Sequence, residues 1–355
     1  MNRVMLLANE KKDFQQIGFR RPLSNLKNAG LIEDFLVESP ELDYAEGMPL
    51  DDLNESLVRA AKRFKPTQIL IMHPHRMHLA SSTLKEFRKI SSPEIILWEG
   101  DAYSLLRKQP NFTDIAVARM SDVVWTVGKG SLRFNLRLYG ARDVRWIPHC
   151  FETDRLRSNS PIRNSSGFIH DLSIIANKSG HRFRPAPGWR ERVEFVSKCQ
   201  EALPDQVSVF GWGWEGPGAK GKLDFNEQYR VISGSRITGN WDHYPRTNSY
   251  FSNRLPISLA AGSVHATTWH PGYNEIFPKM TSQFLLLEKT PKALVERIVN
   301  FLSSTDDETI SQLGFAASVY AFKHFRQDDW IVKMLNSRAE RINPREASES
   351  WSLNS

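Results

Sequence analysis

The sequence predicts an α/β protein of two domains, each with a parallel β-sheet covered by helices on both faces. The length of 355 residues suits two domains of about 100–200 residues each. With 40% hydrophobic and 25% charged residues, the composition is that of a globular protein and excludes disordered, collagen-like and coiled-coil chains. Short runs that are apolar on both faces alternate with longer amphipathic stretches, a pattern typical of parallel sheets.

The first half contains five apolar runs with the length of strands. Between the first two, Leu53, Leu57, Val58 and Ala61 recur at helical spacing, which predicts a helix over residues 50–64. The expected strands are residues 3–9, 67–75, 94–101, 122–128 and 143–149.

The second half repeats this alternation. Thr290 followed by Pro291 is a typical cap and first-turn pair, so a helix should begin there. The expected strands are residues 171–177, 206–213, 235–241, 262–269 and 283–288. The expected helices are residues 190–203, 225–232, 253–261 and 291–302, with further helix after Thr305.

A polar stretch, SNSPIRNSSG, separates the two halves and has the composition of a linker. We therefore expect a first domain over residues 1–157, a linker over 158–168 and a second domain over 169–335. Residues 336–355 should form a tail, because the final ASESWSLNS has too little apolar content to pack firmly.

Composition also limits the compartment and the partners. Two cysteines, Cys150 and Cys199, are too few for a disulfide framework or a cysteine metal site. The apolar run Val4 to Ala8 is too short for a signal peptide or a membrane span, so a cytoplasmic protein is expected. The net charge of +7 favours anionic partners. Because that charge is spread along the chain, nucleotide phosphates or peripheral contact with an anionic membrane come before nucleic acid.

A glycine-rich stretch over residues 211–216 matches the G-x-G-x-x-G pattern after a predicted strand. A dinucleotide fingerprint needs a helix beginning at the third glycine, whose free N–H groups bind the pyrophosphate. Here Pro217 and Gly218 follow, which indicates a loop. A loop that lines a cleft, with Gly211 and Gly213 beside a ligand, is the preferred interpretation.

Imidazoles and carboxylates follow two strands of the first half. His73 and His75 come after ILIM, and Glu99 and Asp101 come after IILW. The carboxyl ends of parallel strands are where open α/β sheets bind ligands. These residues have three possible roles. They could act in acid/base catalysis or substrate positioning, they could bind a metal, or they could be ordinary polar residues at loop ends. No spacing among them matches a recognised zinc pattern.

Basic residues follow the first strand of the second half and begin one of its helices. The guanidinium groups of the arginines suit diphosphate oxygens, and a solvated helix face is the alternative interpretation. Arg254 is the most pointed candidate, and Asn274 and Glu275 would lie at a cleft edge. The other candidates are Lys178, His181, Arg182 and Arg184.

The order of several second-half segments resembles the GT-B glycosyltransferases, and within them the CgeB-like transferases with a group-1-type C-terminal domain. The segments are DLSIIANKSGHRFR, VSVFGWGWEG, YRVISGSRITGNW, SNRLPISLAAGSVHATTWHPGYNEIF and FLLLEKTPKALVERIVNFLSS, followed by FAASVYAFKHF. They cover residues 169–335. In the first half LWEGDA matches more loosely, and VRWIPHCFETD resembles the hinge into the second domain.

The resemblance implies two Rossmann-like domains facing across a cleft, with the nucleotide-sugar donor on the second domain and the acceptor on the first. Such a protein would be a metal-independent, cofactor-free transferase in polysaccharide biosynthesis, acting on a glycan, lipid-linked or protein acceptor. Arg254 and the turn from Lys178 to Arg184 would bind the diphosphate. One of Asp101, Glu99, His73 and His75 would act as the base.

One segment departs from the family pattern. Many group-1 transferases carry a glutamate in the arginine-led helix that holds the donor ribose, whereas the matching Leu255-Pro256-Ile257-Ser258 has no acid. The ribose is then held elsewhere, the donor differs, or activity has been lost. A non-catalytic, degenerate GT-B-like protein that binds a nucleotide or sugar is therefore the alternative function. The sequence does not specify the sugar, the nucleotide, the stereochemical course or the oligomeric state.

Overall fold

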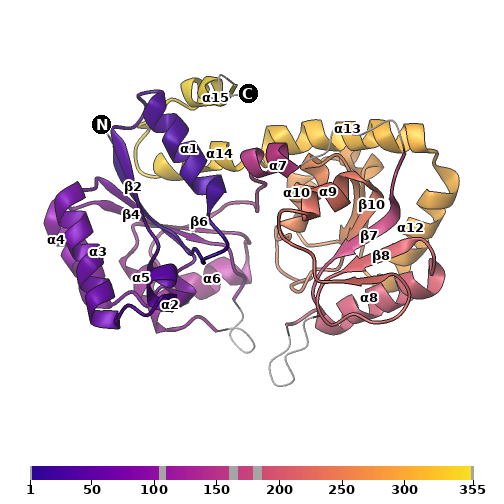
Figure 1. Cartoon of the computed structure of the whole chain (residues 1–355), viewed down its shortest axis with the longest axis horizontal. Coiled ribbons are helices and arrows are strands. Elements are labelled where there is room, and N and C mark those ends of the chain that lie inside the picture. Colours follow the sequence, from indigo (N-terminus) through magenta and orange to yellow (C-terminus); the bar gives the residue numbers. More distant parts are fainter. Residues whose placement is uncertain (1, 104–108, 160–166, 179–185, 353–355) are drawn as a thin grey trace. The chain divides into compact units, whose positions relative to one another are not determined.

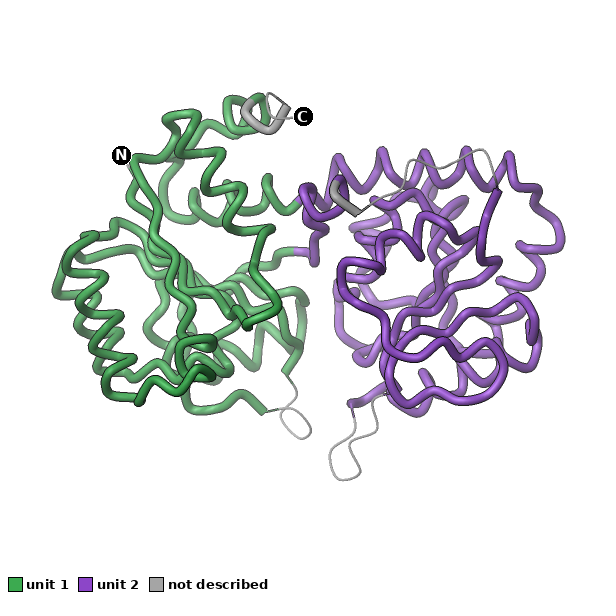
Figure 2. Tube along the Cα trace, in the orientation of Figure 1, with its two compact units in different colours: residues 1–147, 327–355 green, residues 148–326 purple. Residues whose placement is uncertain are grey.

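Two parallel β-sheets organise the chain, one in each of its two units (Figures 1 and 2). The structure is a computed structural model that describes residues 2–103, 109–159, 167–178 and 186–352. The first unit comprises residues 1–147 and 327–355, and the second comprises residues 148–326. The prediction of two parallel-sheet α/β domains is confirmed.

The sheet of the first unit has six strands in the order β2-β1-β3-β4-β5-β6. Its strands are β1 (Arg3–Leu7), β2 (Asp34–Glu38), β3 (Gln68–Met72), β4 (Glu94–Glu99), β5 (Val123–Thr126) and β6 (Val144–Trp146). The strand β2 is not among the strands predicted from the sequence, and its residues DFLVE are all partly exposed. Because an edge strand pairs on one side only, it does not need the continuous apolar run of a central strand.

Helices cover both faces of this sheet (Figure 1). On one side α3, α4 and α5 pack in sequence, and on the other α1 packs against α14 and α15. The helices of this unit are α1 (Ile17–Asn28), α2 (Pro40–Ala45), α3 (Leu50–Phe64), α4 (Ser81–Ser91), α5 (Phe112–Met120), α6 (Ser131–Leu138), α14 (Gln327–Leu335) and α15 (Pro344–Ser352), with a 3₁₀ turn, η1 (Pro74–Arg76). The helix predicted over residues 50–64 is confirmed as α3.

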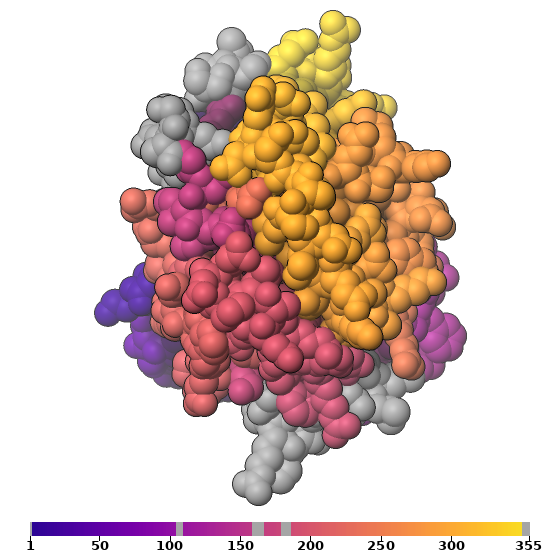
Figure 3. All heavy atoms as spheres, turned by 90° about the vertical axis from the view of Figure 1, so that its right-hand side faces the viewer, coloured from indigo at the N-terminus to yellow at the C-terminus, as the bar shows by residue number. Residues whose placement is uncertain are grey.

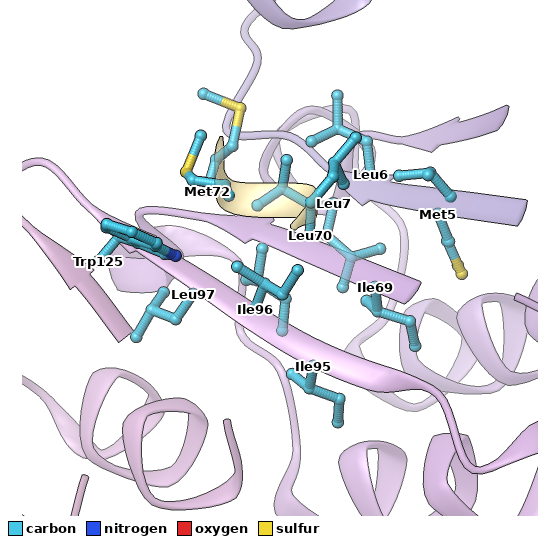
Figure 4. Close-up of a cluster of buried hydrophobic side chains, with 14 of the residues drawn as sticks. Met5, Leu6, Leu7, Ile69, Leu70, Met72, Ile95, Ile96, Leu97 and Trp125 are labelled. Carbon is cyan, nitrogen blue, oxygen red and sulfur yellow. The ribbon is translucent and has the colours of Figure 1, made fainter. Parts of the chain in front are cut away.

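Aliphatic side chains of the central strands form the core of the first unit (Figure 4). Met5, Leu6 and Leu7 of β1 lie beside Ile69 and Leu70 of β3, and all five are fully buried. At about 25 cal/mol for each Å² of apolar surface buried, such strands supply most of the driving force for folding. They hold the carboxyl ends of β1, β3 and β4 in fixed register.

The C-terminal residues belong to the first unit, which differs from the expected tail over residues 336–355 (Figure 2). In α15, Ala347 is 1% exposed, and Ile342 just before the helix is equally buried. The low apolar content predicted a loosely packed end. Ile342 and Ala347 nevertheless belong to the hydrophobic core of the first unit, and α15 packs against α1 and α14.

The sheet of the second unit also has six strands, in the order β12-β11-β10-β7-β8-β9. Its strands are β7 (His170–Ile175), β8 (Val207–Phe210), β9 (Ala219–Gly221), β10 (Ser235–Asn240), β11 (Val264–Thr268) and β12 (Leu285–Glu288). The segment that contains β9 was predicted to be a loop. Its three residues carry no β-branched or aromatic side chain, so composition gave no sign of a strand.

Helices α8 and α12 pack on one face of this sheet, and α9, α10 and α13 pack together on the other. The helices are α7 (Thr153–Asn159), α8 (Trp189–Ala202), α9 (Gln228–Ser233), α10 (Arg254–Ala260), α11 (Tyr273–Ile276), α12 (Pro291–Ser304) and α13 (Asp307–His324), with a 3₁₀ turn, η2 (Lys279–Gln283). Figure 3 shows segments of α12, α13 and α8 over much of the face turned to the viewer. As predicted, Thr290 caps α12, with its hydroxyl accepting from the N–H of Ala293.

The boundary between the units differs from the expected linker. The chain passes between the units at Ile147–Pro148 and again at Arg326–Gln327, rather than once at residues 158–168. Residues 160–166 of that expected linker lie outside the described residues. The segment VRWIPHCFETD, which resembles a hinge in the sequence, contains the first of the two crossings.

Candidate active site

Each sheet has one place at which the direction of strand order reverses. In the first unit this switch point lies between β1 and β3, and in the second between β7 and β10. In open parallel sheets, ligands bind beside the carboxyl ends of the strands at such a point, because the two loops there diverge to opposite faces. The candidate residues are therefore described separately for the carboxyl edge of each sheet.

At the carboxyl edge of the first sheet, His73 lies between two carboxylates. Its Nδ1 is 2.6 Å from Oε1 of Glu99, and its Nε2 is 3.4 Å from Oδ2 of Asp101. The backbone of His73 has a left-handed conformation, with φ of 40°, which is unusual for a residue other than glycine. This geometry brings the ring from the end of β3 to the end of β4, so the structure brings three of the four predicted residues together.

Glu99 and Asp101 differ strongly in environment. The Glu99 side chain is 1% exposed, and its carboxylate also accepts from the N–H of Asp101 and from the hydroxyl of Tyr103. The Asp101 side chain is 38% exposed. Burial, followed by the charges of Glu99, Asp114 and Asp101, raises the pKa of Tyr103, so its hydroxyl remains a donor. Glu99 is held as an orienting group, whereas the side chains of His73 and Asp101 are partly exposed.

His75 has a different partner from His73. Its Nδ1 is 2.8 Å from Oδ2 of Asp114, and its carbonyl accepts from Nδ2 of Asn111. Asn111 and Asp114 form the reciprocal cap of α5. His75 therefore ties η1 to the start of α5, although its ring stacks at 6.1 Å from the ring of His73.

A buried carboxylate that the sequence analysis missed lies beyond the end of β1. Glu10 is 1% exposed and accepts from Arg20, from the Ser39 hydroxyl and from the N–H of Gln16. Burial alone would raise its pKa, but the hydrogen bonds from Arg20, Ser39 and Gln16 lower it below the ordinary value. Because its acceptors are all used, Glu10 fixes the loop after β1 and is not a candidate base.

At the carboxyl edge of the second sheet, the loops after β7 and β8 are in direct contact. Gly211 has φ of 139°, and a Cβ there would lie 2.0 Å from the carbonyl oxygen of Ala176, so no other residue suits this position. The N–H of Lys178 donates to the carbonyl of Trp212, and its Nζ lies 5.8 Å from the centre of the Trp214 ring. The predicted Lys178 and Gly211 therefore lie in adjoining loops.

The other candidate residues predicted near the second sheet are not all described by the structure. Gly213 is in the same loop, with its Cβ position 3.3 Å from Cβ of Lys178. His181, Arg182 and Arg184 lie outside the described residues. After Gly216 the chain forms β9, and the next helix, α9, begins at Gln228, so this stretch is not a dinucleotide fingerprint.

Arg254, the first residue of α10, reaches back to the sheet. Its Nε donates to the carbonyl of Ile175, the last residue of β7, at 2.5 Å. No other described residue is hydrogen-bonded to its guanidinium group. Burial lowers its pKa, and the charge of Asp242 opposes this shift. The predicted arginine thus lies beside the switch point of the second sheet.

The segment in which the family pattern would have a glutamate lies in the interior. Pro256, Ile257 and Ser258 are all buried in α10. Ser258 lines a small cavity of about 10 Å³ together with Arg254, Thr238 and His265, which is room for about one water molecule. Burial lowers the pKa of His265 to about 4, so this imidazole is neutral at pH 7.

A buried ionic cluster that the sequence analysis did not single out connects the ends of β10 and β11. Asp242 is 1% exposed, and its Oδ2 is 3.0 Å from Nε2 of the fully buried His270. Asn240 donates to Oδ1 of Asp242, and the N–H of Asp242 donates to Thr268. Burial alone would raise the pKa of Asp242, but the hydrogen bond and charge of His270 and the charge of Arg192 lower it well below its usual range.

Arg192 of α8 completes this cluster. Its Nε donates to the carbonyl of Trp241, and its Nη1 lies 2.6 Å from Nε2 of His243. Burial and then the charge of Arg254 lower the pKa of Arg192 to about 9, whereas Asp242 opposes the shift. It remains a cation at pH 7. Arg192, Arg254 and Lys178 place three cations at this edge beside the buried carboxylate of Asp242, and such a group of cations is suitable for binding an anion.

Asn274 and Glu275 are exposed on the short helix α11. Their neighbour Tyr273 is buried, and its ring lies 5.1 Å from that of His270. The two predicted residues thus follow directly after the buried cluster without being part of it.

Comparisons with solved structures identify the fold. The chain resembles a sucrose-phosphate synthase from Thermosynechococcus elongatus over the whole of both chains (TM-score 0.58, 13% identity). It resembles HepE from Anabaena, solved with UDP-glucose, over 95% of this chain and 100% of that one (TM-score 0.58, 12% identity). A glycosyltransferase from Rickettsia africae matches over 95% and 98% (TM-score 0.60, 11% identity). The chain has the GT-B fold.

The GT-B fold is shown here by structure alone. No protein-family model matches the chain, and no curated protein matches it in sequence. Among the described residues, no helix is long and apolar enough to cross a membrane. No group of three or more His, Cys, Asp or Glu residues within the described ranges has a metal-binding arrangement.

Proposed function

We propose that this GT-B protein is a glycosyltransferase that moves a sugar from a nucleotide-sugar donor to an acceptor hydroxyl. The observation that carries the proposal is Arg254, an inward-pointing arginine with unused NH₂ groups at the switch point of the second sheet. A partly buried guanidinium whose NH₂ donors have no acceptor is costly unless an anion binds beside it. The solved HepE structures with UDP-glucose and with UDP favour a nucleotide sugar as that anion.

The donor diphosphate would bind the cationic edge formed by Arg254, Arg192 and Lys178. As the bond between the anomeric carbon and the diphosphate oxygen breaks, negative charge accumulates on the leaving group. Fixed cations in a site shielded from water stabilise that charge and supply what a metal ion supplies in other transferases. We therefore propose a metal-independent reaction, whose rate should not change when a chelator is added.

The acceptor hydroxyl would bind the carboxyl edge of the first sheet. With Nδ1–H donated to Glu99, Nε2 is the basic nitrogen of His73, and Asp101 lies beside it. His73 would take the acceptor proton as the new bond to the anomeric carbon forms, and Glu99 would stabilise the resulting imidazolium. Of the four predicted catalytic residues, His73 is then the base and Glu99 its positioning residue. Asp101 orients the acceptor, and His75 is structural.

Finer features of the reaction are also proposals. The acceptor is a glycan, a lipid-linked sugar or a protein, reached in the cytoplasm, with a role in polysaccharide biosynthesis. The order of the second-unit segments supports a CgeB-like transferase. The donor ribose would be held outside Leu255–Ser258, because that stretch is buried in the protein interior.

That buried stretch also supports the second candidate, a non-catalytic GT-B-like protein that binds a nucleotide or sugar. A transferase and a binding protein differ in turnover and not in affinity. Release of nucleoside diphosphate from a panel of nucleotide sugars, measured with and without oligosaccharide acceptors, separates them. Binding without release for any donor would favour the second candidate, and the absence of both would contradict each.

Replacing histidines at the first edge tests the assigned base. His73→Gln should lower turnover by about 10²–10⁴-fold while nucleotide affinity stays unchanged, because only proton transfer is lost. The matched control is His75→Gln, which should lower the melting temperature by breaking its bond to Asp114 but keep turnover within a few-fold. Equal turnover in wild type and His73→Gln would contradict His73 as the base and indicate Asp101 instead.

A further inference from the structure

Four arginines surround a concavity at the opposite, amino edge of the first sheet, far along the strands from the candidate active site. The concavity has a volume of about 520 Å³ and is lined by Arg88, Arg119, Arg142 and Arg338, with Asp122 and Asp143. We call it the arginine pocket. The two aspartates directly precede β5 and β6, and Arg338 comes from the segment between α14 and α15. All of these residues belong to the first unit.

The arginine pocket is built around one mostly buried carboxylate. Asp122 is 2.6 Å from Nη2 of Arg88 and 3.1 Å from Nη1 of Arg338, and it also accepts from the N–H of Ile95. Arg88 donates further to the carbonyls of Pro93 and Met120. These bonds fix Arg88 and direct Arg338 to the same wall, so two cations are positioned before any ligand arrives.

The segment that carries Arg338 is itself firmly attached. Ser337 accepts from the indole nitrogen of Trp125 at 2.9 Å, and its carbonyl accepts from Arg145 at 2.6 Å. Asn336 accepts from the N–H groups of Arg341 and Ile342, which closes the turn before α15. The docking of the C-terminal helices thus assembles one side of the arginine pocket.

The positive charge of the arginine pocket exceeds its negative charge. Asp143 is paired with Arg145, so its carboxylate does not neutralise the lining arginines. Within the described ranges, Arg119 forms one side-chain hydrogen bond, in which its Nε donates to the carbonyl of Tyr139. Of the described residues, none is hydrogen-bonded to the Arg142 side chain. The guanidinium forks of Arg119 and Arg142 are therefore available, and forks of this kind bind phosphate oxygens in pairs.

We propose that the arginine pocket binds a phosphate-bearing anion. It is separate from the proposed donor site, which lies in the other unit, and it does not rest on the proposed function. Two sources share this chemistry, a soluble phosphate compound and the headgroup of an anionic lipid. Phe134 and Leu138 of α6 are 63% and 61% exposed and precede the Tyr139 that holds Arg119, so a lipid surface is one source to be tested.

Titration calorimetry of the full chain with inorganic pyrophosphate tests the site. The double variant Arg119→Ala/Arg142→Ala should raise the Kd at this site at least about 10-fold, since each arginine contributes a charge-assisted contact. Arg59→Ala/Arg63→Ala removes the same charge from the exposed face of α3 and should leave the Kd unchanged. If the double variant melts early, Arg142→Ala alone gives the same test without loss of a bond to any described residue.

Because pyrophosphate can also bind the second unit, hydrogen exchange is needed to show which segments of the chain the bound pyrophosphate protects. Saturating pyrophosphate is expected to protect residues 119–123, 138–144 and 335–342 in the wild type and not in the double variant. Vesicle sedimentation then distinguishes the sources. Arginine-dependent binding to phosphatidylglycerol but not phosphatidylcholine indicates a headgroup, and pyrophosphate binding without vesicle binding indicates a soluble phosphate. No protection of these segments at about 10 mM pyrophosphate, or equal affinity in the double variant, would overturn the proposal.

Discussion

At the scale of single residues, the buried pair of Asp242 and His270 determines how the second unit responds to pH. Asp242 accepts hydrogen bonds from His270 and Asn240, and its pKa is well below the ordinary value of 3.8. A carboxyl group whose pKa is lowered by folding stabilises the protein above its unfolded pKa. It loses that contribution as the pH falls toward the folded pKa.

Asp242→Asn should therefore destabilise the protein in a pH-dependent manner. Removing the charge of a buried, hydrogen-bonded carboxylate costs about 1–3 kcal/mol, so a loss of this size is expected at pH 7. The difference from wild type should begin to shrink below about pH 4, because wild-type Asp242 then starts to become protonated in the unfolded chain. Urea unfolding followed by tryptophan fluorescence at pH 7 and pH 3 measures it.

An exposed aspartate provides the control for this experiment. Asp51→Asn on α3 should change the unfolding free energy by less than about 0.5 kcal/mol at both pH values. A destabilisation by Asp242→Asn that is as large at pH 3 as at pH 7 would show that shape, and not charge, accounts for the role of Asp242.

Individual residues also show how much of the candidate site could be predicted from the sequence. His73, Glu99 and Asp101 were found because each follows an apolar strand directly, and the carboxyl ends of adjacent parallel strands meet. Asp242 and His270 also follow strands, so the signal was present for both. The contact between Asp242 and His270 could not be predicted from the sequence, because it depends on β10 and β11 being neighbours in the sheet.

At the scale of secondary-structure elements, long amphipathic helices were predicted well and short or terminal elements poorly. The α3 prediction was confirmed because five buried apolar residues recur at helical spacing. The short strands β2 and β9 and the helix α15 carry little intrinsic signal. They form because a sheet edge or an apolar pair of helices is already present. That condition depends on tertiary contacts, which the local sequence does not show.

Docking of α15 gives an element-scale prediction. Ala347→Lys places a charge at a buried position against the first unit and should cost about 1–3 kcal/mol. Ser348→Lys, one residue later and exposed, is the matched control and should be nearly neutral. Thermal melting and limited proteolysis of the C-terminal segment measure both variants. Equal melting temperatures for the two variants would be inconsistent with a docked α15.

At the scale of the whole molecule, the sequence predicts two parallel sheets but not how the chain is shared between the units. Each sheet follows from local apolar runs. The return of residues 327–355 to the first unit follows from contacts of α14 and α15 with α1, about 300 residues away in the chain. Composition therefore indicated a linker at 158–168, whereas contacts place the crossings at Ile147–Pro148 and Arg326–Gln327.

The central claim is that the carboxyl edge of the second sheet binds a nucleoside diphosphate through Arg254. Calorimetric titration of UDP, GDP and ADP should identify one that binds the wild type. Arg254→Ala removes a charge-assisted contact worth about 1.5–3 kcal/mol, so its Kd should rise by about 10- to 150-fold. Arg230→Ala, an exposed arginine on α9, should bind like wild type. Unchanged affinity in an Arg254→Ala protein with wild-type melting temperature would contradict the assignment.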